Sequence, residues 1–214
     1  MASLETLKAM VIAGDEGATH ETEVLLAEGS TARNIIDDAL LPGMDVVGER
    51  MRSGDCFIPE VLLSARTMQA CLDIVKPRLA VGESSSVAKM LIGTVEGDVH
   101  DIGKNLVAML LEGAGFEVVN LGRSVKTVDF LSAVREHRPD ILGMSALLTT
   151  TIPRMGETLR ALEAADLREG LKVIVGGAPV NQAYADEIGA DAYGPNAAVA
   201  VDRCRELAKQ LASR

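Results

Sequence analysis

The segment from Gly97 to Gly103 places a histidine between two carboxylates: Asp98 stands two residues before His100, and Asp101 follows it directly. A neutral imidazole nitrogen is a good ligand for a transition metal. It binds best when a carboxylate accepts a hydrogen bond from the other ring nitrogen, because this bond fixes the tautomer and raises the basicity. Asp98 can reach that nitrogen from an extended loop. The pattern therefore predicts a metal ligand, His100, that Asp98 orients.

The sequence offers this site only one histidine, because His20 and His137 fall in segments with helical patterns. A lone histidine cannot build a tight zinc site from protein groups alone. It can complete the coordination of a metal that a macrocycle already holds. The tripeptide Asp-x-His is also common by itself, so a histidine that merely caps a helix or is satisfied within a loop remains an open alternative at this point.

Beyond residue 87 the sequence alternates between short apolar runs and amphipathic segments. This alternation predicts an α/β fold with a parallel sheet covered on both faces, and five strands fit a flavodoxin-like or Rossmann-like domain. The expected strands are Met90–Val95, Glu117–Leu121, Ile141–Ser145, Lys172–Val175 and Ala190–Tyr193. The expected helices are Asn105–Ala114, Thr127–Glu136, Arg154–Ala165, Asn181–Glu187 and Ala197–Ala212.

Two polar loops follow neighbouring strands of this predicted sheet. Asp98 and His100 come after the first strand, whereas Ser145, Thr149 and Thr151 come at or after the end of the third. In an open parallel sheet, ligands bind beyond the carboxyl ends of the strands, where the strand order reverses. The first and third strands are neighbours in the flavodoxin-like order. We therefore expect both loops to face one cavity.

The first 80 residues show helical periodicity and almost no strand signal. Leu4, Leu7, Met10 and Val11 repeat at the spacing of one helix face. Three further helical segments follow, with an expected break or kink at Pro42-Gly43, and this pattern is typical of a four-helix bundle. We expect a helical cap at 1–80, a polar linker at 81–88 that can act as a hinge, and a binding domain at 89–214.

Composition narrows the function further. The net charge of −10 argues against a nucleic-acid partner, which needs a basic footprint. The sequence lacks an apolar run of the roughly 18–20 residues that span a bilayer, and its start lacks the pattern of a signal peptide. The three cysteines form no CxxC pair and are typical of reduced, buried thiols. These features predict a cytoplasmic protein without a membrane partner.

The motifs around His100 resemble the cobalamin-binding signature of methionine synthase and of the small corrinoid methyl-carrier proteins. That signature is Asp-x-His-x-x-Gly, then Ser-x-Leu, then Gly-Gly. Here the elements are Asp98–Gly103, Ser145-Ala146-Leu147 and Gly176-Gly177, each at or after the end of a predicted strand. Upstream, the runs around Pro42 and Pro59 are similar to the helical cap of the same proteins, so the resemblance covers nearly the whole chain.

The resemblance implies a role for each matching residue. His100 would be the lower axial ligand of cobalt, in place of the nucleotide base of the corrinoid, with Asp98 hydrogen-bonded to it. The third member of this network is a serine in methionine synthase, and it aligns with Thr151 here. Gly93, Gly143, Gly176 and Gly177 would lack side chains where the displaced nucleotide tail passes. The remaining implied corrinoid contacts are Gly97, Val99, Asp101, Ile102, Gly103, Ser145, Leu147, Thr149, Gly176, Gly177, Asn196 and Ala197, with Phe57 and Val61 covering the upper face from the cap.

The implied function is that of a methyl-carrier subunit in one-carbon metabolism, which holds a cobalamin or related cobamide and is not a complete enzyme. One partner, a substrate-specific methyltransferase, would load the methyl group. A second would move it to tetrahydrofolate or a thiol coenzyme, and a reductive activator would restore oxidised cobalt. Three alternatives remain: a B12-dependent light-sensing regulator, a mutase subunit, and a binding module that matches the motif by chance. The acidic charge argues against the first and the helical cap against the second.

Overall fold

The computed structural model describes residues 2–78 and 86–213. These residues divide into two compact units, one formed by Met1–Ser86 with Glu112–Gly115, the other by Val87–Leu111 with Phe116–Arg214. Most of the predicted linker, and with it the predicted hinge, lies outside the described residues. Within the described ranges, each helix is too short or too polar to cross a membrane.

The first unit is helical, as predicted, and four helical runs build it. Their apolar faces are buried against one another, and its core includes Leu7, Leu25, Ile35 and Met68. The elements are α1 (Leu4–Ala13), α2 (Ala18–Ala27), α3 (Ala32–Ile35), the π-helical turn η1 (Ile36–Leu40), α4 (Leu41–Ser53), α5 (Ile58–Val75) and the 3-10 turn η2 (Lys76–Arg78).

Of the expected break or kink at Pro42-Gly43, the break does not occur: the chain stays helical from α3 through η1 into α4, with a π-helical turn just before Pro42. Proline lacks the backbone N–H of an ordinary helical residue, and its ring collides with the carbonyl one turn earlier. The wider π turn just before Pro42 relieves that collision without ending the helix. Gly43 then packs closely on α1, because a Cβ added there would lie 3.1 Å from the Val11 side chain.

The second unit is a five-stranded parallel sheet in the order β2-β1-β3-β4-β5, which is the flavodoxin-like order. The strands lie within a few residues of their predicted positions. They are β1 (Lys89–Thr94), β2 (Glu117–Asn120), β3 (Ile141–Ser145), β4 (Lys172–Gly176) and β5 (Ala192–Gly194), connected by helices α6 (Ile102–Gly113), α7 (Thr127–His137), α8 (Pro153–Ala164), α9 (Gln182–Ile188) and α10 (Ala197–Ala212).

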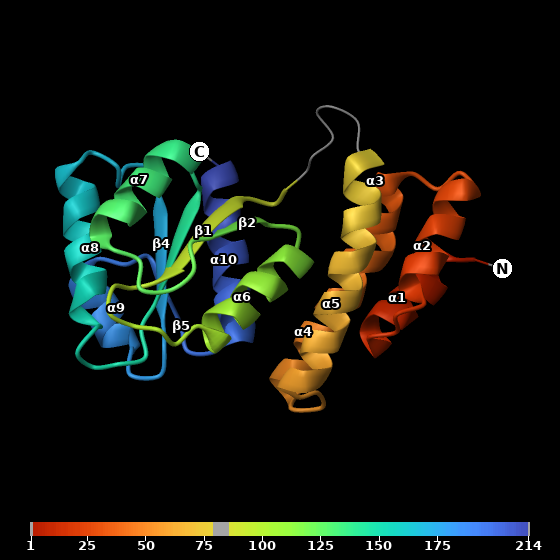
Figure 1. The fold of residues 1–214 in the computed structure, drawn as a ribbon, viewed down its shortest axis with the longest axis horizontal. Coiled ribbons are helices and arrows are strands. Elements are labelled where there is room, and N and C mark those ends of the chain that lie inside the picture. Colours follow the sequence, from red (N-terminus) through yellow and green to blue (C-terminus); the bar gives the residue numbers. More distant parts are fainter. Residues whose placement is uncertain (1, 79–85, 214) are drawn as a thin grey trace. The chain divides into compact units, whose positions relative to one another are not determined.

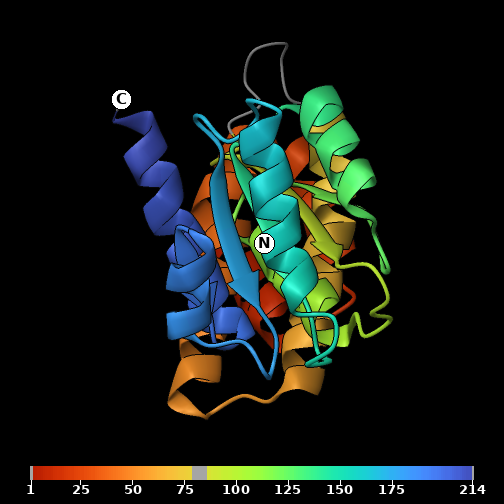
Figure 2. The ribbon, with the colours of Figure 1, turned by 90° about the vertical axis from the view of Figure 1, so that its left-hand side faces the viewer.

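Helices cover both faces of this sheet. Figure 1 shows α7, α8 and α9 on one face and α6 and α10 on the other, and Figure 2 looks onto the α8 side. Phe130 on α7 and Met155 and Leu159 on α8 are buried in the apolar cluster on the first face. The three cysteines are free, as the sequence predicts, but only Cys71 and Cys204 are buried.

The carboxyl ends of the strands form one edge of the sheet. The register places Thr94 of β1 beside Ser145 of β3, Ser145 beside Gly176 of β4, and Gly176 beside Gly194 of β5. The loops after β1 and β3 therefore leave the sheet side by side, as the flavodoxin-like order predicts. This edge is where the predicted site residues gather.

Candidate functional site

The loop after β1 reverses direction within a few residues and then presents His100. The Asp98 N–H donates to the Val95 carbonyl oxygen at 3.1 Å, which closes a tight turn. Gly97 has a φ of +82° in this turn, a conformation that glycine adopts without strain. The Thr94 hydroxyl donates to the His100 carbonyl oxygen at 3.3 Å, so the loop is tied back to the end of β1.

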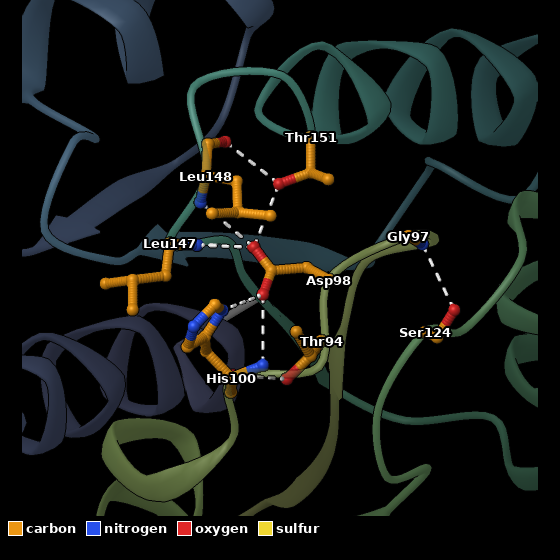
Figure 3. A network of polar contacts seen from close by, with 8 residues as sticks. All are labelled: Thr94, Gly97, Asp98, His100, Ser124, Leu147, Leu148 and Thr151. Carbon is orange, nitrogen blue, oxygen red and sulfur yellow. Dashed lines mark hydrogen bonds and ion pairs between the residues drawn. The ribbon is translucent and has the colours of Figure 1, made fainter.

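The Asp98 carboxylate joins the two loops, with one oxygen serving each (Figure 3). Its Oδ1 accepts the His100 backbone N–H at 3.0 Å and lies 2.8 Å from His100 Nδ1. Its Oδ2 accepts the backbone N–H groups of Leu147 at 2.7 Å and Leu148 at 3.1 Å, and the Thr151 hydroxyl at 2.9 Å. Asp98 is 0% exposed, so these donors take the place of water.

These donors also determine the charge of Asp98. Burial alone would raise the pKa of this carboxyl. The hydrogen bonds from His100, Leu147 and Leu148 act in the opposite direction and hold the pKa of Asp98 far below its ordinary value. Asp98 is therefore ionised at neutral pH and acts only as a hydrogen-bond acceptor.

An ionised Asp98 decides which nitrogen of His100 carries the proton. Because a carboxylate has no proton to donate, Nδ1 must be the donor in the 2.8 Å contact. In the neutral imidazole, Nε2 is then unprotonated and has a lone pair for a metal. The His100 side chain is 46% exposed, so this nitrogen can be reached from outside the protein.

Large apolar side chains on the two loops that carry His100 and hold Asp98 are exposed. Val99 and Ile102 flank His100 along the chain, and Ile102 is 83% exposed. The side chains of Leu147 and Leu148 are about half as exposed as that of Ile102. The backbone N–H groups of both leucines donate to Asp98, which places these residues next to it. A Cβ added at Gly103 would meet open space. The surface around His100 thus suits a broad apolar ligand that approaches the backbone closely.

The structure brings Thr151, the residue that the resemblance links to Asp98, within hydrogen-bond distance of that carboxylate. Besides its contact with Asp98, its Oγ1 lies 2.9 Å from the Leu148 carbonyl oxygen, so its single proton has two acceptors. The ionised carboxylate is the stronger acceptor. The Tyr184 hydroxyl donates to the Ile152 carbonyl oxygen at 2.8 Å and anchors the neighbouring residue. A threonine therefore makes the contact that a serine hydroxyl would make.

The glycines of the signature have different reasons to be glycine. At Gly177, with φ +130°, a Cβ would collide with the Ala146 carbonyl oxygen, and at Gly176 it would lie 2.9 Å from the Gly194 carbonyl oxygen. Both therefore keep the ends of β3, β4 and β5 close together. At Gly93 the obstacle is the Phe130 ring at 2.9 Å. The core on the α7 face explains Gly93 without a ligand, contrary to the expectation that its missing side chain leaves room for the nucleotide tail.

The other predicted residues lie outside the Asp98 network. A Cβ at Gly143 would collide with the Met90 side chain, the flexible end of a core residue. Asn196 caps α10 by accepting the Val199 N–H at 2.9 Å, and Ala197 is buried. Thr149 is exposed in the loop after β3, and Asp101 accepts the Asn105 N–H with its carbonyl oxygen.

The two predicted cap residues belong to the helical unit and differ in exposure. Phe57 precedes α5 and is 69% exposed, whereas Val61 is fully buried. The Glu60 carboxylate accepts the Phe57 N–H at 2.8 Å, which fixes the start of this helix. Ile58, Leu62 and Leu63 are also exposed, so the first two turns of α5 carry an apolar surface to which Phe57 contributes and Val61 does not.

Sequence reasoning missed Ser124 and the backbone role of Leu148. Ser124 Oγ accepts the Gly97 N–H at 3.1 Å (Figure 3). The Ser124 N–H also donates to the Asp98 carbonyl oxygen at 3.0 Å. Ser124 follows β2, whose carboxyl end lies at the same edge, and that position was the available signal. The contact of Leu148 is a backbone contact, so its side chain gave no sign of it.

Fold and site together define a class: a flavodoxin-like sheet that presents one oriented imidazole at the carboxyl edge of its strands. In the described residues, no cluster of three or more His, Cys, Asp or Glu side chains could hold a metal ion. His100 can therefore contribute one ligand to a metal that brings its other ligands with it.

Two family profiles match the chain, both described as a B12 binding domain, one over residues 88–202 and the other over residues 3–76. The chain belongs to the B12-binding corrinoid proteins. It is 38% identical to a corrinoid protein of Desulfitobacterium hafniense over 211 residues, which cover 97% of this chain and 98% of the relative. It is 44% identical to dimethylamine corrinoid protein 1 of Methanosarcina acetivorans over 174 residues, or 81% and 82% of the two chains.

Two solved structures are similar over both units. One is a cobalamin-binding protein from Desulfitobacterium hafniense, with a TM-score of 0.79 and 38% identity, covering 97% of this chain and 99% of that one. The other is the methanol:cobalamin methyltransferase complex MtaBC from Methanosarcina barkeri, with a TM-score of 0.88 and 30% identity, covering 96% of this chain and 79% of that one.

Proposed function

We propose that this protein is a methyl carrier that binds a corrinoid with His100 Nε2 as the lower axial ligand of cobalt, in place of the nucleotide base of the corrinoid. The observation that carries the proposal is the contact of 2.8 Å between His100 Nδ1 and a buried, ionised Asp98, because it leaves the lone pair on Nε2. Its relatives include corrinoid proteins named for dimethylamine and trimethylamine.

The residues around His100 fit such a ligand. A corrin ring is broad and largely apolar on its faces, and Val99, Ile102, Leu147 and Leu148 offer exposed apolar side chains around the imidazole. Gly103 leaves the backbone open to close approach. When bound, cobalt in the corrin supplies the chemistry, since it can accept a methyl group and release it to a second acceptor.

The protein groups have simpler tasks. Asp98 holds the imidazole in one tautomer and one orientation, and the donors on its Oδ2 keep it ionised. Thr151 supplies the one side-chain donor in that set, a hydroxyl that can follow changes in the charge of the Asp98–His100 pair. In this proposal, the exposed apolar surface of α5 at Phe57 shields the upper face of the corrin from water.

The proposal requires partners. A substrate-specific methyltransferase would load the methyl group and a second methyltransferase would take it to tetrahydrofolate or a thiol coenzyme. A reductive activator would return oxidised cobalt to the cycle. The similarity to a chain of the MtaBC complex supports the first of these partners. We further propose that the carrier works in the cytoplasm, where its free thiols stay reduced.

The decisive test is anaerobic reconstitution with cobalamin, followed by EPR of the Co(II) form. The wild-type protein should bind one cobalt per chain and show hyperfine splitting from one imidazole nitrogen. His100→Ala should keep the fold, measured by circular dichroism, and lose the splitting. His137→Ala, at the end of α7, is the matched control and should keep it. Splitting that persists in His100→Ala would exclude His100 as the ligand, and a failure to bind any corrinoid would exclude the function.

The methyl donor can be tested separately. The reconstituted protein would be incubated with methanol, methylamines, methoxylated aromatics or betaines and the methyltransferase specific to each. Methylation appears as a change in the visible corrin spectrum. The proposal expects one donor system to load the wild-type protein and to load His100→Ala at least about tenfold more slowly, the usual cost of disturbing a metal ligand shell.

A further inference from the structure

Lys104 is a buried lysine that the proposed methyl carrier does not otherwise use. It stands in the first turn of α6, four residues after His100, and is 3% exposed. Burial lowers the pKa of its ammonium group, and the charge of Asp101 opposes that change. The start of a helix also disfavours a cation, because the helix dipole is positive there. Burial and the helix dipole thus both disfavour a charged Lys104, so favourable contacts of its ammonium group must offset them.

The Lys104 ammonium is the centre of a triangle with two asparagines. Its Nζ donates to Asn105 Oδ1 and to Asn120 Oδ1, both at 2.6 Å. Asn120 Nδ2 donates in turn to Asn105 Oδ1 at 3.1 Å, which closes the triangle. Asn105 belongs to α6, whereas Asn120 is the last residue of β2. Lys104 therefore joins the start of α6 to the end of β2 through short, charge-assisted hydrogen bonds.

The loop after β2 connects this triangle to the backbone of the His100 loop. Asn120 Oδ1 also accepts the Gly122 N–H at 3.0 Å, and the Gly122 carbonyl oxygen accepts the Thr94 N–H at 3.0 Å. Two residues on, Ser124 Oγ accepts the Gly97 N–H (Figure 3), and the Ser124 N–H donates to the Asp98 carbonyl oxygen. The path runs from Lys104 through Asn120 and the loop 121–124 to the Gly97 N–H and the Asp98 carbonyl oxygen.

We propose that Lys104 is a positioning residue for His100: its ammonium group fixes the loop 121–124 through Asn120, and this loop sets the place of the Gly97–His100 backbone. The inference rests on the proposed role of His100 as the cobalt ligand. Lysine suits the task because one ammonium group has three donors, enough for both amide oxygens with one to spare. An apolar side chain of the same length would fill the space and leave both oxygens without that donor.

The test compares Lys104→Met with Lys209→Met, a matched change of an exposed lysine near the end of α10. Hydrogen exchange of the apo protein is measured first. In Lys104→Met, the amides of Gly122 and Ser124 should exchange about tenfold faster than in the wild type, as expected when a bond that closes the loop is lost. Amides in the centre of β3 should stay unchanged. Unchanged exchange in the loop would overturn the proposal that Lys104 fixes the loop 121–124.

The cobalt readout follows on the reconstituted protein. Lys104→Met should lose at least half of the Co(II) signal with imidazole splitting and bind cobalamin about threefold to tenfold more weakly. A merely structural role would lower stability and leave the splitting intact. Faster loop exchange with an unchanged EPR signal would therefore overturn the positioning role. If the wild type itself shows no imidazole splitting, the proposal that His100 is the cobalt ligand is wrong. The exchange measurement still decides whether Lys104 fixes the loop 121–124.

Asn120→Ala provides a second route that keeps the buried lysine and removes its link to β2. It should reproduce the faster loop exchange and the reduced splitting. The double variant with Lys104→Met should be no worse than about the larger single effect, because both changes break the same path. Fully additive effects, or an Asn120→Ala protein that behaves like the wild type, would contradict the proposed path.

Discussion

Replacing Asp98 by asparagine tests the site most directly, because the side chain keeps its shape and exchanges one oxygen for an NH₂ group. Oδ1 faces two donors from His100, and Oδ2 faces three donors from the turn after β3. An amide NH₂ group cannot accept hydrogen bonds, so it should take the place of Oδ1, which faces two donors rather than three. There it donates to His100 Nδ1, which moves the imidazole proton to Nε2. That tautomer has no lone pair for cobalt.

The magnitude follows from the same contacts. The His100 backbone N–H loses its acceptor, which costs about 1–3 kcal/mol. The three bonds at Oδ2 change from charged to neutral and each weaken by roughly 1 kcal/mol. Removing a buried charge offsets part of this loss. The net destabilisation is on the order of 2–4 kcal/mol, or about 5–15 °C in Tm for a unit of this size. Cobalamin affinity should fall by about 10–100-fold.

The assay combines calorimetry of the apo protein with a cobalamin titration and EPR of the Co(II) form. Asp140→Asn is the control, since Asp140 accepts the Lys89 N–H at 2.7 Å with one carboxylate oxygen before β3. It should lower stability modestly and leave the imidazole splitting unchanged. The tautomer argument is refuted if Asp98→Asn binds cobalamin within about twofold of the wild type and keeps the full splitting.

Two further predictions concern the partner of Asp98 and a network at the amino-terminal end of β4. Thr151→Val should cost about 1 kcal/mol in urea unfolding, because Asp98 keeps its backbone donors, whereas Thr151→Ser should stay within about 0.5 kcal/mol. The Asp191 carboxylate accepts hydrogen bonds from Lys172 Nζ at 2.9 Å and from Arg168 Nη2 at 2.6 Å. Burial raises the pKa of Asp191, but these partners lower it more, so that it lies below the ordinary value. The ionised Asp191 carboxylate therefore stabilises the folded state at neutral pH, and this contribution is lost as the pH falls through the lowered pKa. Asp191→Asn should cost roughly 1–3 kcal/mol at pH 7, with a smaller difference near ~pH 3; an equal difference at both pH values would contradict the linkage.

Sequence predicted the fold well because its signals were local or followed from a general rule. The strands and helices of the second unit lie close to their expected positions, and the flavodoxin-like order places the loops of Asp98 and Thr151 side by side. The structure brings Thr151 to 2.9 Å from Asp98, and its assignment as the third member of the ligand network stays a prediction. Of the predicted break or kink at Pro42, the break does not occur, because the tendency of proline to end a helix does not show whether a wider turn can absorb the collision.

Contacts made by the backbone, or by residues from a third loop, could not be predicted. The N–H groups of Leu147 and Leu148 hold Asp98, yet neither side chain indicates it. Ser124 has a φ of +53° and links two loops, a role set by tertiary structure rather than by residue type. Gly93 was misread for a related reason: the missing Cβ makes room for Phe130, which lies 37 residues further along the chain.

The distribution of donors over the two Asp98 oxygens has a consequence for His100. A carboxylate that accepts many hydrogen bonds spreads its charge over them, so each further donor on Oδ2 weakens the pull of Oδ1 on the Nδ1 proton. That pull sets how basic Nε2 is as a ligand. The turn after β3 thus tunes His100 without touching it. Of its three donors, only the Thr151 hydroxyl can rotate away, toward the Leu148 carbonyl oxygen, and so only this donor can adjust how basic His100 Nε2 is.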